Sequence, residues 1–225
     1  MSLSASPTLR NPRFPASTTF GHHVRVISED GIVLRTRDGV DELIVNGVFA
    51  MDSTEVSSEL ALADAALPAA RVLVGGLGLG YTAARLLDGG AELVRVVELS
   101  AELVDAARRG ATAQLGRLAA DPRVELVTGD IADAIEGSWN AILLDVDNGP
   151  TFLIHDHNAR LYRAEFLRRC LAALSPSGRL VIWCETASPE LEASLADVAA
   201  QVEKLVVPVT RGERQFEYVL YRAIR

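Results

Sequence analysis

The sequence predicts an α/β fold, in which helices cover both faces of a mostly parallel sheet and a small subdomain of β-hairpins comes first. From Arg71 onward, near-continuous apolar runs of strand length alternate with segments of helical periodicity, as expected for parallel strands buried on both faces. Before that point, short β-branched runs are separated by the turn signals EDG, RDG and NG. The chain closes with two strand-like runs joined by a short polar loop, which predicts a terminal antiparallel pair.

Composition narrows the class of protein. A chain of 225 residues with 49% hydrophobic residues can bury a full core. Its formal net charge of −8 gives no basic surface that would recruit nucleic acid. No apolar stretch approaches the ~20 residues of a membrane helix, and Cys170 and Cys184 lie too far apart for a zinc or redox motif. We expect a cytoplasmic protein that binds neither nucleic acid nor membrane.

Three regions are predicted along the chain. Residues 1–19 are rich in Ser, Thr and Pro without periodicity, which indicates a flexible arm. Residues 20–66 form the small subdomain, with a meander of hairpins over 22–52. A helix over 53–67 follows, because apolar positions at helical spacing come after a Ser/Thr start. Residues 67–225 form the ligand-binding domain.

The ligand-binding domain is predicted to be doubly wound. Five parallel strands are expected at 71–76, 93–99, 123–130, 141–147 and 179–185. Helices are expected at 81–89, 101–115, 131–137, 159–175 and 188–202. The last helix opens with a serine cap, Ser188, and has Pro189 at its first helical position. The final strands, 204–210 and 215–224, complete a seven-stranded sheet with a terminal antiparallel pair, which is the layout of Rossmann-like class I methyltransferase domains.

Residues that directly follow the strands should line one ligand site, because ligands of open α/β sheets bind beyond the carboxyl ends of the strands. Glu98 lies twenty residues past Gly78 (98 − 78), where a carboxylate can accept both hydroxyls of a ribose. Glycines let the backbone approach a ligand closely. The sequence therefore predicts a nucleoside site whose cofactor-binding residues are Gly76, Gly78, Gly80, Glu98, Asp130 and Ile131.

The identity of the nucleoside rests on three features. GLGYTA, residues 78–83, also fits the dinucleotide pattern G-x-G-x-x-G/A, so NAD is an alternative. An adenosyl sulfonium is favoured by the G-x-G-x-G spacing directly after the strand and by the terminal strand pair. It is also favoured by Asp130, which can accept a hydrogen bond from an adenine amine.

The order of these pieces resembles the spermidine synthase (polyamine aminopropyltransferase) family from about Asp41 to the C-terminus. VLVGGLGLG is similar to that family's glycine loop, VVELSAELVDAAR to its second strand and helix, and WNAILLDVDNGP to its fourth strand and substrate loop. The resemblance implies a homodimeric transferase of polyamine biosynthesis. It would use S-adenosylmethionine (AdoMet) or decarboxylated AdoMet to alkylate a small amine and would release methylthioadenosine.

The substrate half of the site departs from the family. Leu79 stands where the family has an aspartate that contacts the aminopropyl amine. Ser57 and Ser58 replace a Tyr-His pair over the polyamine. The two aspartates of the substrate loop correspond to Asp145 and Asn148. An additional acid, Asp147, lies between them, and Asp147 and Asn148 are the predicted substrate-binding residues.

Asp145 is the predicted catalytic residue. An amine with a pKa near ~10.4 must lose a proton before it attacks a carbon next to a sulfonium, and a carboxylate at the end of the fourth strand can accept it. Two alternatives remain: a methyltransferase on a small molecule, and a catalytically lapsed nucleoside-binding homologue. HDHN, residues 155–158, contains possible metal ligands, but CETASPE lacks the Asp-Asn pair of metal-dependent O-methyltransferases, so no metal is expected.

Overall fold

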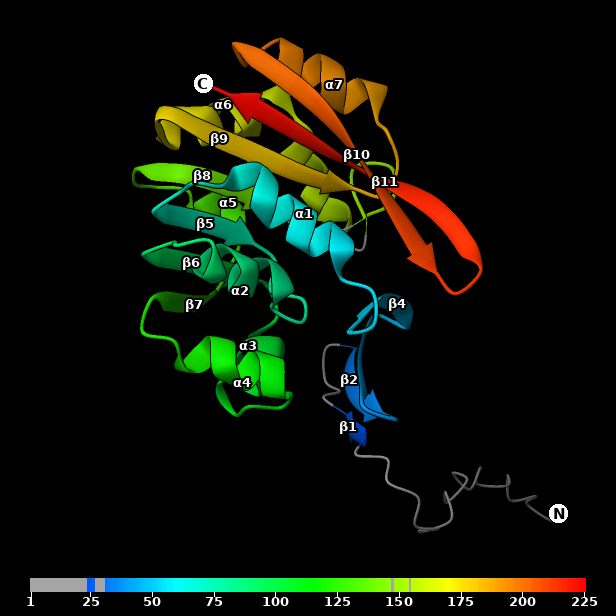
Figure 1. Cartoon of the computed structure of the whole chain (residues 1–225). Helices are drawn as coiled ribbons and strands as arrows, with labels where there is room; N and C mark the ends of the chain where they lie inside the picture. Colours follow the sequence, from blue (N-terminus) through cyan, green and yellow to red (C-terminus); the bar gives the residue numbers. More distant parts are fainter. Residues whose placement is uncertain (1–23, 27–30, 147, 154) are drawn as a thin grey trace, which may run out of the picture.

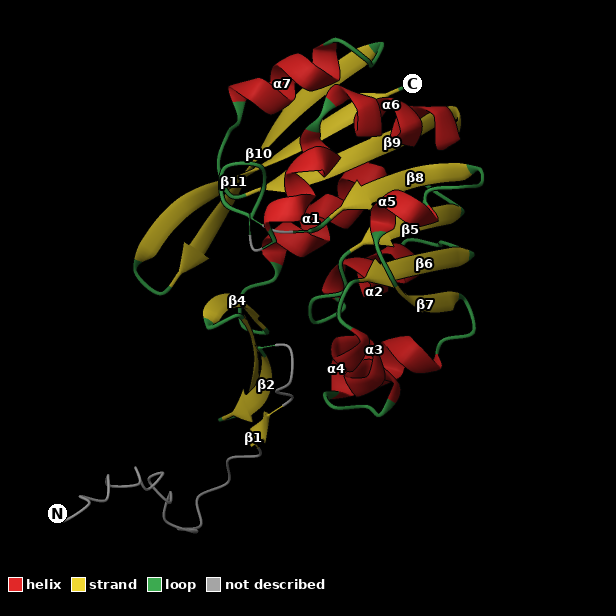
Figure 2. Ribbon diagram, turned by 180° about the vertical axis from the view of Figure 1, so that it is seen from behind, coloured by secondary structure: helices red, strands yellow, loops and turns green. Residues whose placement is uncertain are grey.

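The computed structural model confirms the predicted α/β class (Figure 1). It describes residues 24–26, 31–146, 148–153 and 155–225. The arm predicted over 1–19, and Asp147 of the substrate loop, lie outside the described residues. Two sheets are present, a four-stranded sheet near the N-terminus and a seven-stranded sheet formed by the rest of the chain (Figure 2).

The N-terminal sheet is the predicted meander, with neighbours in chain order and all pairs antiparallel. Its strands are β1 (Val24–Val26), β2 (Ile32–Arg37), β3 (Val40–Val45) and β4 (Val48–Asp52). Two-residue turns join β2 to β3 and β3 to β4. Both residues have positive φ in each turn: Asp38 and Gly39, then Asn46 and Gly47. These are the angles that the DG and NG signals predict for tight hairpins.

The large sheet has the order β10-β11-β9-β8-β5-β6-β7. Its strands are β5 (Arg71–Gly75), β6 (Leu93–Glu98), β7 (Val124–Thr128), β8 (Trp139–Leu144), β9 (Leu174–Cys184), β10 (Gln201–Arg211) and β11 (Arg214–Ile224). The strands from β5 to β9 pair in parallel, whereas β11 is antiparallel to both β9 and β10. The strand order reverses at β5, which has β6 on one side and β8 on the other. This is the switch point at which doubly wound sheets bind ligands.

Helices cover both faces of this sheet (Figures 1 and 2). One core lies between the sheet and α1 (Ser57–Ala66), α2 (Tyr81–Asp88), α3 (Ala101–Arg108) and α4 (Ala113–Ala120). The other includes side chains of α5 (Ile131–Ala134), the 3₁₀ helix η1 (Asp156–Tyr162), α6 (Ala164–Ala173) and α7 (Pro189–Ala196). Within the described residues, no helix is both long and apolar enough to span a bilayer.

Several helices differ in extent from the prediction. The segment expected as one helix over 101–115 is two, α3 and α4, because Gly110 takes a φ of +66° and Thr112 caps α4 by accepting from the Leu115 N–H at 3.1 Å. The segment over 159–175 begins as η1, and α6 starts only at Ala164. The helix expected over 188–202 ends at Ala196 because β10 begins at Gln201.

Side-chain capping sets the start of α7, whereas a turn precedes α1. Ser188 accepts from the Leu191 N–H at 3.2 Å, with Pro189 at the first helical position as predicted. The first helix begins at Ser57, later than expected. Asp52 accepts from the Thr54 N–H at 2.9 Å and holds the preceding residues in a turn.

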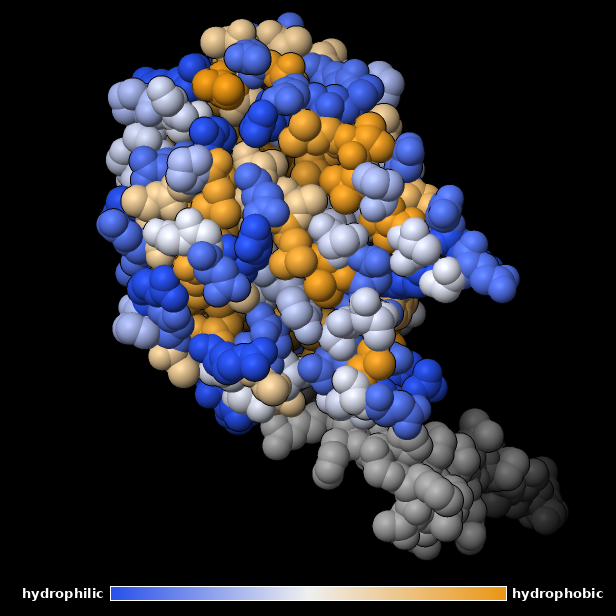
Figure 3. All heavy atoms as spheres, viewed as in Figure 1, coloured by the Kyte–Doolittle hydropathy of each residue, from blue (hydrophilic) through white to orange (hydrophobic). Residues whose placement is uncertain are grey.

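Apolar residues also reach the surface. Figure 3 shows hydrophobic residues gathered over the area where α1 and the β10–β11 hairpin lie in Figure 1. Leu205 and Val207 of β10 are only partly buried against the core there. Beyond this area the hairpin extends past the edge of the sheet toward β4 (Figures 1 and 2).

Candidate active site

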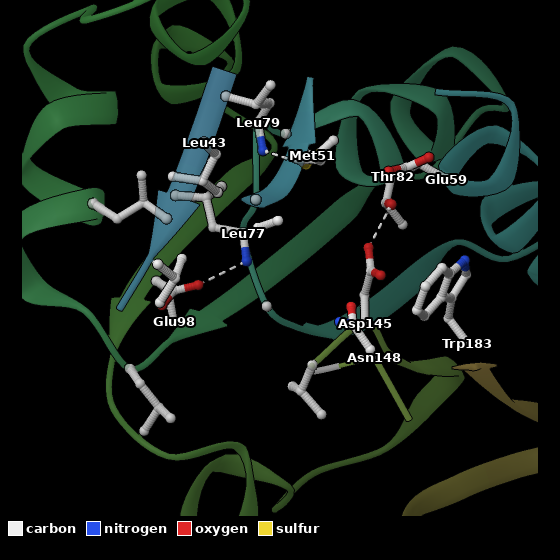
Figure 4. Close-up of a pocket in the computed structure, with 18 of the residues that line it drawn as sticks. Leu43, Met51, Glu59, Leu77, Leu79, Thr82, Glu98, Asp145, Asn148 and Trp183 are labelled. Atoms are coloured by element: carbon white, nitrogen blue, oxygen red, sulfur yellow. Dashed lines mark hydrogen bonds between the residues drawn. The ribbon is translucent and has the colours of Figure 1, made fainter. Parts of the chain in front are cut away.

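A pocket with a cavity volume of about 430 Å³ lies beyond the carboxyl ends of β5, β6 and β8 (Figure 4). The N-terminal sheet, α1 and the last three strands of the large sheet complete its wall. The structure brings together all of the predicted site residues that it describes. They are Gly76, Gly78, Gly80, Glu98, Asp130, Ile131, Asp145 and Asn148.

The glycine loop fits closely against the end of β8. Gly76 has a φ of +95°, and a Cβ built there would lie 2.1 Å from the Asp145 carbonyl oxygen. The Gly76 N–H donates to the Val97 carbonyl at 2.9 Å, and the Asp145 N–H donates to the Gly75 carbonyl at 2.9 Å. The loop is therefore fixed to both neighbouring strands, and no side chain separates its backbone from the pocket at Gly76.

Glu98 joins the end of β6 to the glycine loop. Its Oε2 accepts from the Leu77 N–H at 2.9 Å (Figure 4). Its Oε1 accepts from the Ser100 N–H at 2.9 Å. These bonds fix the carboxylate at the pocket wall. A carboxylate offers about four acceptor sites, so Glu98 retains capacity for two hydroxyl donors.

Asp130 has partners of its own at the rim. Its Oδ1 caps α5 by accepting from the Ala132 N–H at 2.8 Å. Its Oδ2 accepts from Arg160 Nη2, and His157 Nε2 lies 3.8 Å from the same oxygen. Ile131, which is 4% exposed, lies next to it on the apolar part of the wall. A donor group of any ligand at this rim would therefore share Asp130 with Arg160.

Asp145 is a partly buried carboxylate of the pocket wall. Thr82 Oγ1 donates to its Oδ2 at 2.8 Å (Figure 4). Burial, reinforced by the negative charge of Glu59, raises the pKa of Asp145 to about 7, although the Thr82 hydrogen bond opposes this. The side chain thus changes protonation state near neutral pH, as a general base requires.

Glu59 is a second acid of the pocket, and sequence reasoning missed it. It comes from the first turn of α1 and accepts from Ser58 Oγ at 2.7 Å. Burial raises its pKa. A signal was present in the sequence, because apolar Leu62 and Ala63 follow three and four residues later and side chains at these spacings share one helix face. In the structure both are fully buried.

The residues that depart from the spermidine synthase pattern occupy different environments. Leu79 is 1% exposed and belongs to the main core, and its N–H donates to Met51 Sδ at 3.3 Å. Ser58 is buried in the pocket wall, whereas Ser57 is exposed. Asn148 lines the pocket, and its carbonyl accepts from the Glu185 N–H at 3.0 Å.

Aromatic residues from three strands also line the pocket, and these too were missed. The rings of Trp183 of β9 and Tyr218 of β11 are in contact at a tilt of 53°, with centroids 4.7 Å apart. Arg211 of β10 lies over Phe49 of β4, 5.2 Å from its ring centroid. They come from strand interiors and a hairpin end, where no local motif marks a site.

The HDHN segment contributes to the pocket through His155 and Asn158. Asn158 is 2% exposed and belongs to η1. Over the described ranges of the chain, no group of three His, Cys, Asp or Glu side chains is placed to hold a metal ion.

Comparisons with known proteins agree with this fold. A polyamine aminopropyltransferase from Synechococcus sp. (strain JA-3-3Ab) is 32% identical over 127 residues, which are 53% of this chain and 38% of that protein. The matched region thus spans well under half of that relative.

Solved spermidine synthases share the architecture. The enzyme from Thermotoga maritima superposes with a TM-score of 0.69 at 18% identity, covering 86% of this chain and 68% of that one. A spermidine synthase in complex with the transition state analogue AdoDATO superposes with a TM-score of 0.69 at 19% identity. The match covers 86% of this chain and 69% of that one. A probable spermidine synthase from Corynebacterium glutamicum ATCC 13032 superposes with a TM-score of 0.66 at 21% identity. The match covers 93% of this chain and 81% of that one.

A protein-family model matches this chain over most of the large sheet, its helices and part of the N-terminal sheet. The matched residues are 43–209, which include the glycine loop, Glu98, Asp130 and Asp145. The predicted fold and the observed strand order agree with this match. The chain therefore belongs to the methyltransferase small domain family.

Proposed function

We propose that this protein is a spermidine-synthase-like transferase that uses AdoMet or decarboxylated AdoMet to alkylate a small amine. The observation that carries the proposal is the placement of Glu98 and Asp145 at the ends of β6 and β8, on either side of the glycine loop, in one pocket. The aminopropyltransferase relative supports it, as does the AdoDATO complex of a spermidine synthase with this fold.

The nucleoside half of the pocket has groups that fit an adenosyl sulfonium. Gly78 has a φ of +51°, and a Cβ there would lie only 2.9 Å from Met51 Sδ, so the loop packs too closely against β4 to accept a side chain at this position. Glu98 would accept the ribose hydroxyls, while Asp130 and Ile131 would hold the adenine. When bound, a sulfonium supplies an electrophilic carbon and a thioether leaving group.

The acceptor half would be organised by Asp145. Its carboxylate would take the proton from an incoming ammonium, so that the neutral amine can attack. Thr82 fixes the orientation of that carboxylate through the 2.8 Å hydrogen bond. Asn148 lines the same region, and we assign acceptor binding to it and to Asp147.

A thermal-shift comparison of AdoMet, decarboxylated AdoMet, methylthioadenosine and NAD tests the proposal. A ligand at 100 times its dissociation constant stabilises the folded protein by about 2.7 kcal/mol. Adenosyl ligands are expected to raise the melting temperature and NAD is not. A shift with NAD alone would remove the basis of the assignment.

Glu98→Ala is expected to weaken the binding of methylthioadenosine by about 1 to 3 kcal/mol, because charge-assisted hydrogen bonds to the ribose are lost. It should also reduce the preference for ribose over deoxyribose ligands. Asp130→Ala is expected to weaken binding by a similar amount through the adenine. Titration calorimetry measures both effects.

Glu125→Ala is the matched control for these variants, because Glu125 is an exposed acid of β7 outside the pocket wall. Melting curves show whether each variant is folded. Wild-type affinity in both Glu98→Ala and Asp130→Ala would exclude these residues from the nucleoside site.

Methyl transfer from AdoMet to a small acceptor is the second candidate. Leu79 favours it, because the glycine loop lacks the acid that would pair with an aminopropyl amine. The coproduct separates the two reactions: aminopropyl transfer releases methylthioadenosine, whereas methyl transfer releases S-adenosylhomocysteine. The proposal also includes a homodimeric state and a cytoplasmic location. Both rest only on the resemblance to spermidine synthases.

A further inference from the structure

Thr82 is a buried polar residue at the start of α2, close to the glycine loop. It is 4% exposed and lines the pocket. Ala83 and Leu86 of the same helix are buried too, and an apolar side chain would suit such surroundings. A buried hydroxyl lowers stability unless it has a hydrogen-bond partner. The partner of Thr82 therefore indicates why a hydroxyl is present at this position.

That partner is the carboxylate of Asp145. Thr82 Oγ1 donates to Asp145 Oδ2 at 2.8 Å (Figure 4), a contact between residues 63 apart in the sequence. A hydroxyl donates a single proton, so Thr82 has none left for a carbonyl of its own helix, which is a frequent partner of helical threonines. The bond joins α2 to the residue that follows β8 and therefore acts on the site rather than on the helix.

The two carboxylate oxygens of Asp145 differ in their contacts. Over the described part of the chain, Thr82 is the only residue that donates a hydrogen bond to this side chain, and it bonds to Oδ2. The backbone is fixed as well, because the Asp145 N–H donates to the Gly75 carbonyl at 2.9 Å. With the backbone and Oδ2 both held, the direction of Oδ1 is determined. Oδ1 keeps its acceptor capacity for a donor such as an ammonium.

Charged and titratable groups surround Asp145 on several elements. On the acceptor side they are Glu55 and Glu59 from around the start of α1, Tyr81 of α2, Glu185 after β9, Arg211 of β10 and Tyr218 of β11. The acids of the nucleoside half and His155 complete the set. Burial and the negative charge of Glu59 raise the pKa of Asp145, whereas the Thr82 hydrogen bond lowers it. Thr82 and Glu59 therefore act on one carboxylate in opposite directions.

We propose that Thr82 is the positioning residue of the general base: its hydroxyl holds Oδ2 of Asp145, so that Oδ1 receives the proton of the acceptor amine. The inference rests on the proposed function, in which Asp145 is the base. In the step, the ammonium gives one proton to Oδ1, and the freed lone pair forms the new nitrogen–carbon bond. The carbon–sulfur bond of the adenosyl sulfonium breaks, and its electron pair stays on sulfur as a thioether. Thr82 keeps its own proton throughout.

Two replacements of Thr82 separate positioning from packing. Thr82→Val keeps the size and branching of the side chain but has no donor, whereas Thr82→Ser keeps the donor and loses a methyl group. If Thr82 served only the core, the valine variant would match the wild type and the serine variant would be the weaker one. Positioning predicts the reverse order. Thr82→Ala, which also lacks the donor, replaces Thr82→Val if that variant does not fold.

The first measurement follows the ionisation of Asp145 and requires no acceptor. The full chain, labelled with ¹³C at its aspartate carboxyl carbons, is titrated by NMR, and Asp145→Asn identifies the signal. We expect a midpoint at about pH 7 for the wild type and about one pH unit higher for Thr82→Val, because the charged form loses a hydrogen bond. Thr82→Ser should titrate like the wild type. Glu59→Gln should lower the midpoint, because a like charge is removed.

The second measurement is the pH profile of kcat. Release of methylthioadenosine or S-adenosylhomocysteine is followed between about pH 5 and about pH 9 with a panel of primary amines that includes putrescine and n-butylamine. In Thr82→Val the acid limb should move up by about one pH unit. The plateau above it should fall about tenfold, because the ionised carboxylate is no longer held in place. Thr82→Ser should restore both the limb and the plateau.

Thr36→Val is the matched control. Thr36 Oγ1 donates to Asp41 Oδ1 at 2.6 Å between β2 and β3, and neither residue lines the pocket. The variant therefore removes the same kind of threonine–aspartate hydrogen bond away from the site. It should keep the wild-type midpoint of Asp145 and the wild-type pH profile. Melting curves show whether each variant is folded.

The outcomes are separable from those of the proposed function. A wild-type midpoint and profile in Thr82→Val overturn the inference, and so does a Thr82→Ser protein that is impaired as strongly as Thr82→Val. Absence of methylthioadenosine binding and of turnover in the wild type contradicts the proposed function instead. In that case the NMR midpoints still decide whether Thr82 holds the Asp145 carboxylate.

Discussion

Asp145→Asn is expected to lower turnover by about 100-fold or more while cofactor affinity stays close to that of the wild type. Asparagine has nearly the same shape and its amide oxygen can still accept the Thr82 hydrogen bond, which is 2.8 Å in the structure. It cannot take a proton from the acceptor amine. Turnover is measured as release of methylthioadenosine or S-adenosylhomocysteine with small amine acceptors, and affinity by calorimetry.

Asp133→Asn is the matched control, because Asp133 is an exposed acid of α5 that does not line the pocket. It should leave turnover unchanged. Turnover of Asp145→Asn within a few-fold of wild type would defeat the general-base assignment. An inactive wild type on every acceptor would instead favour the nucleoside-binding homologue without catalysis.

The nucleoside half could be predicted because it depends on local sequence and one topological rule. A buried apolar run followed by Gly76 or Glu98 marks a strand end. Parallel strands then bring their carboxyl ends to one edge of the sheet. The glycine loop, Glu98, Asp130 and Asp145 could therefore be grouped without knowledge of any tertiary contact, and the structure places them in one pocket.

The acceptor half depends on contacts between distant segments. Arg211 reaches the pocket because the β10–β11 hairpin extends to β4, where Phe49 lies under the guanidinium. Trp183 is an interior residue of an apolar strand, and its sequence environment is that of a core residue. The N–H of Trp139 donates to the Ile135 carbonyl at 3.3 Å, whereas the N–H of Trp183 has no partner among the described residues. Nothing in the local sequence pattern separates the two indoles.

Glu59 shows a limit of reasoning by family pattern. The resemblance drew attention to Ser57 and Ser58, where aromatic and imidazole groups are missing. The adjacent acid carries the electrostatic effect, since Glu59 raises the pKa of Asp145. Its helix position relative to Leu62 placed it on the inward face, and a charge on such a face is a functional candidate because burial without a purpose is costly.

The ionisation of Asp145 should also destabilise the protein as pH rises. Burial and Glu59 raise the pKa of Asp145 from its ordinary value of 3.8 to about 7 in the folded state. The folded protein therefore binds this proton more tightly than the unfolded chain does. The resulting stabilisation is complete below the unfolded pKa and is lost as pH rises through the folded one.

Asp145→Asn is accordingly expected to gain stability relative to wild type between pH 5 and pH 8, by on the order of 2 kcal/mol. The free energy of unfolding, measured by urea denaturation at both pH values, checks this, with Asp133→Asn as the control that should follow the wild type.

Wild-type turnover should rise over the same interval, because a general base acts when deprotonated. Opposite pH trends in stability and turnover would thus come from one carboxylate. Parallel stability curves for wild type and Asp145→Asn would show that Asp145 ionises at its ordinary pKa and would remove the argument that its burial serves proton transfer.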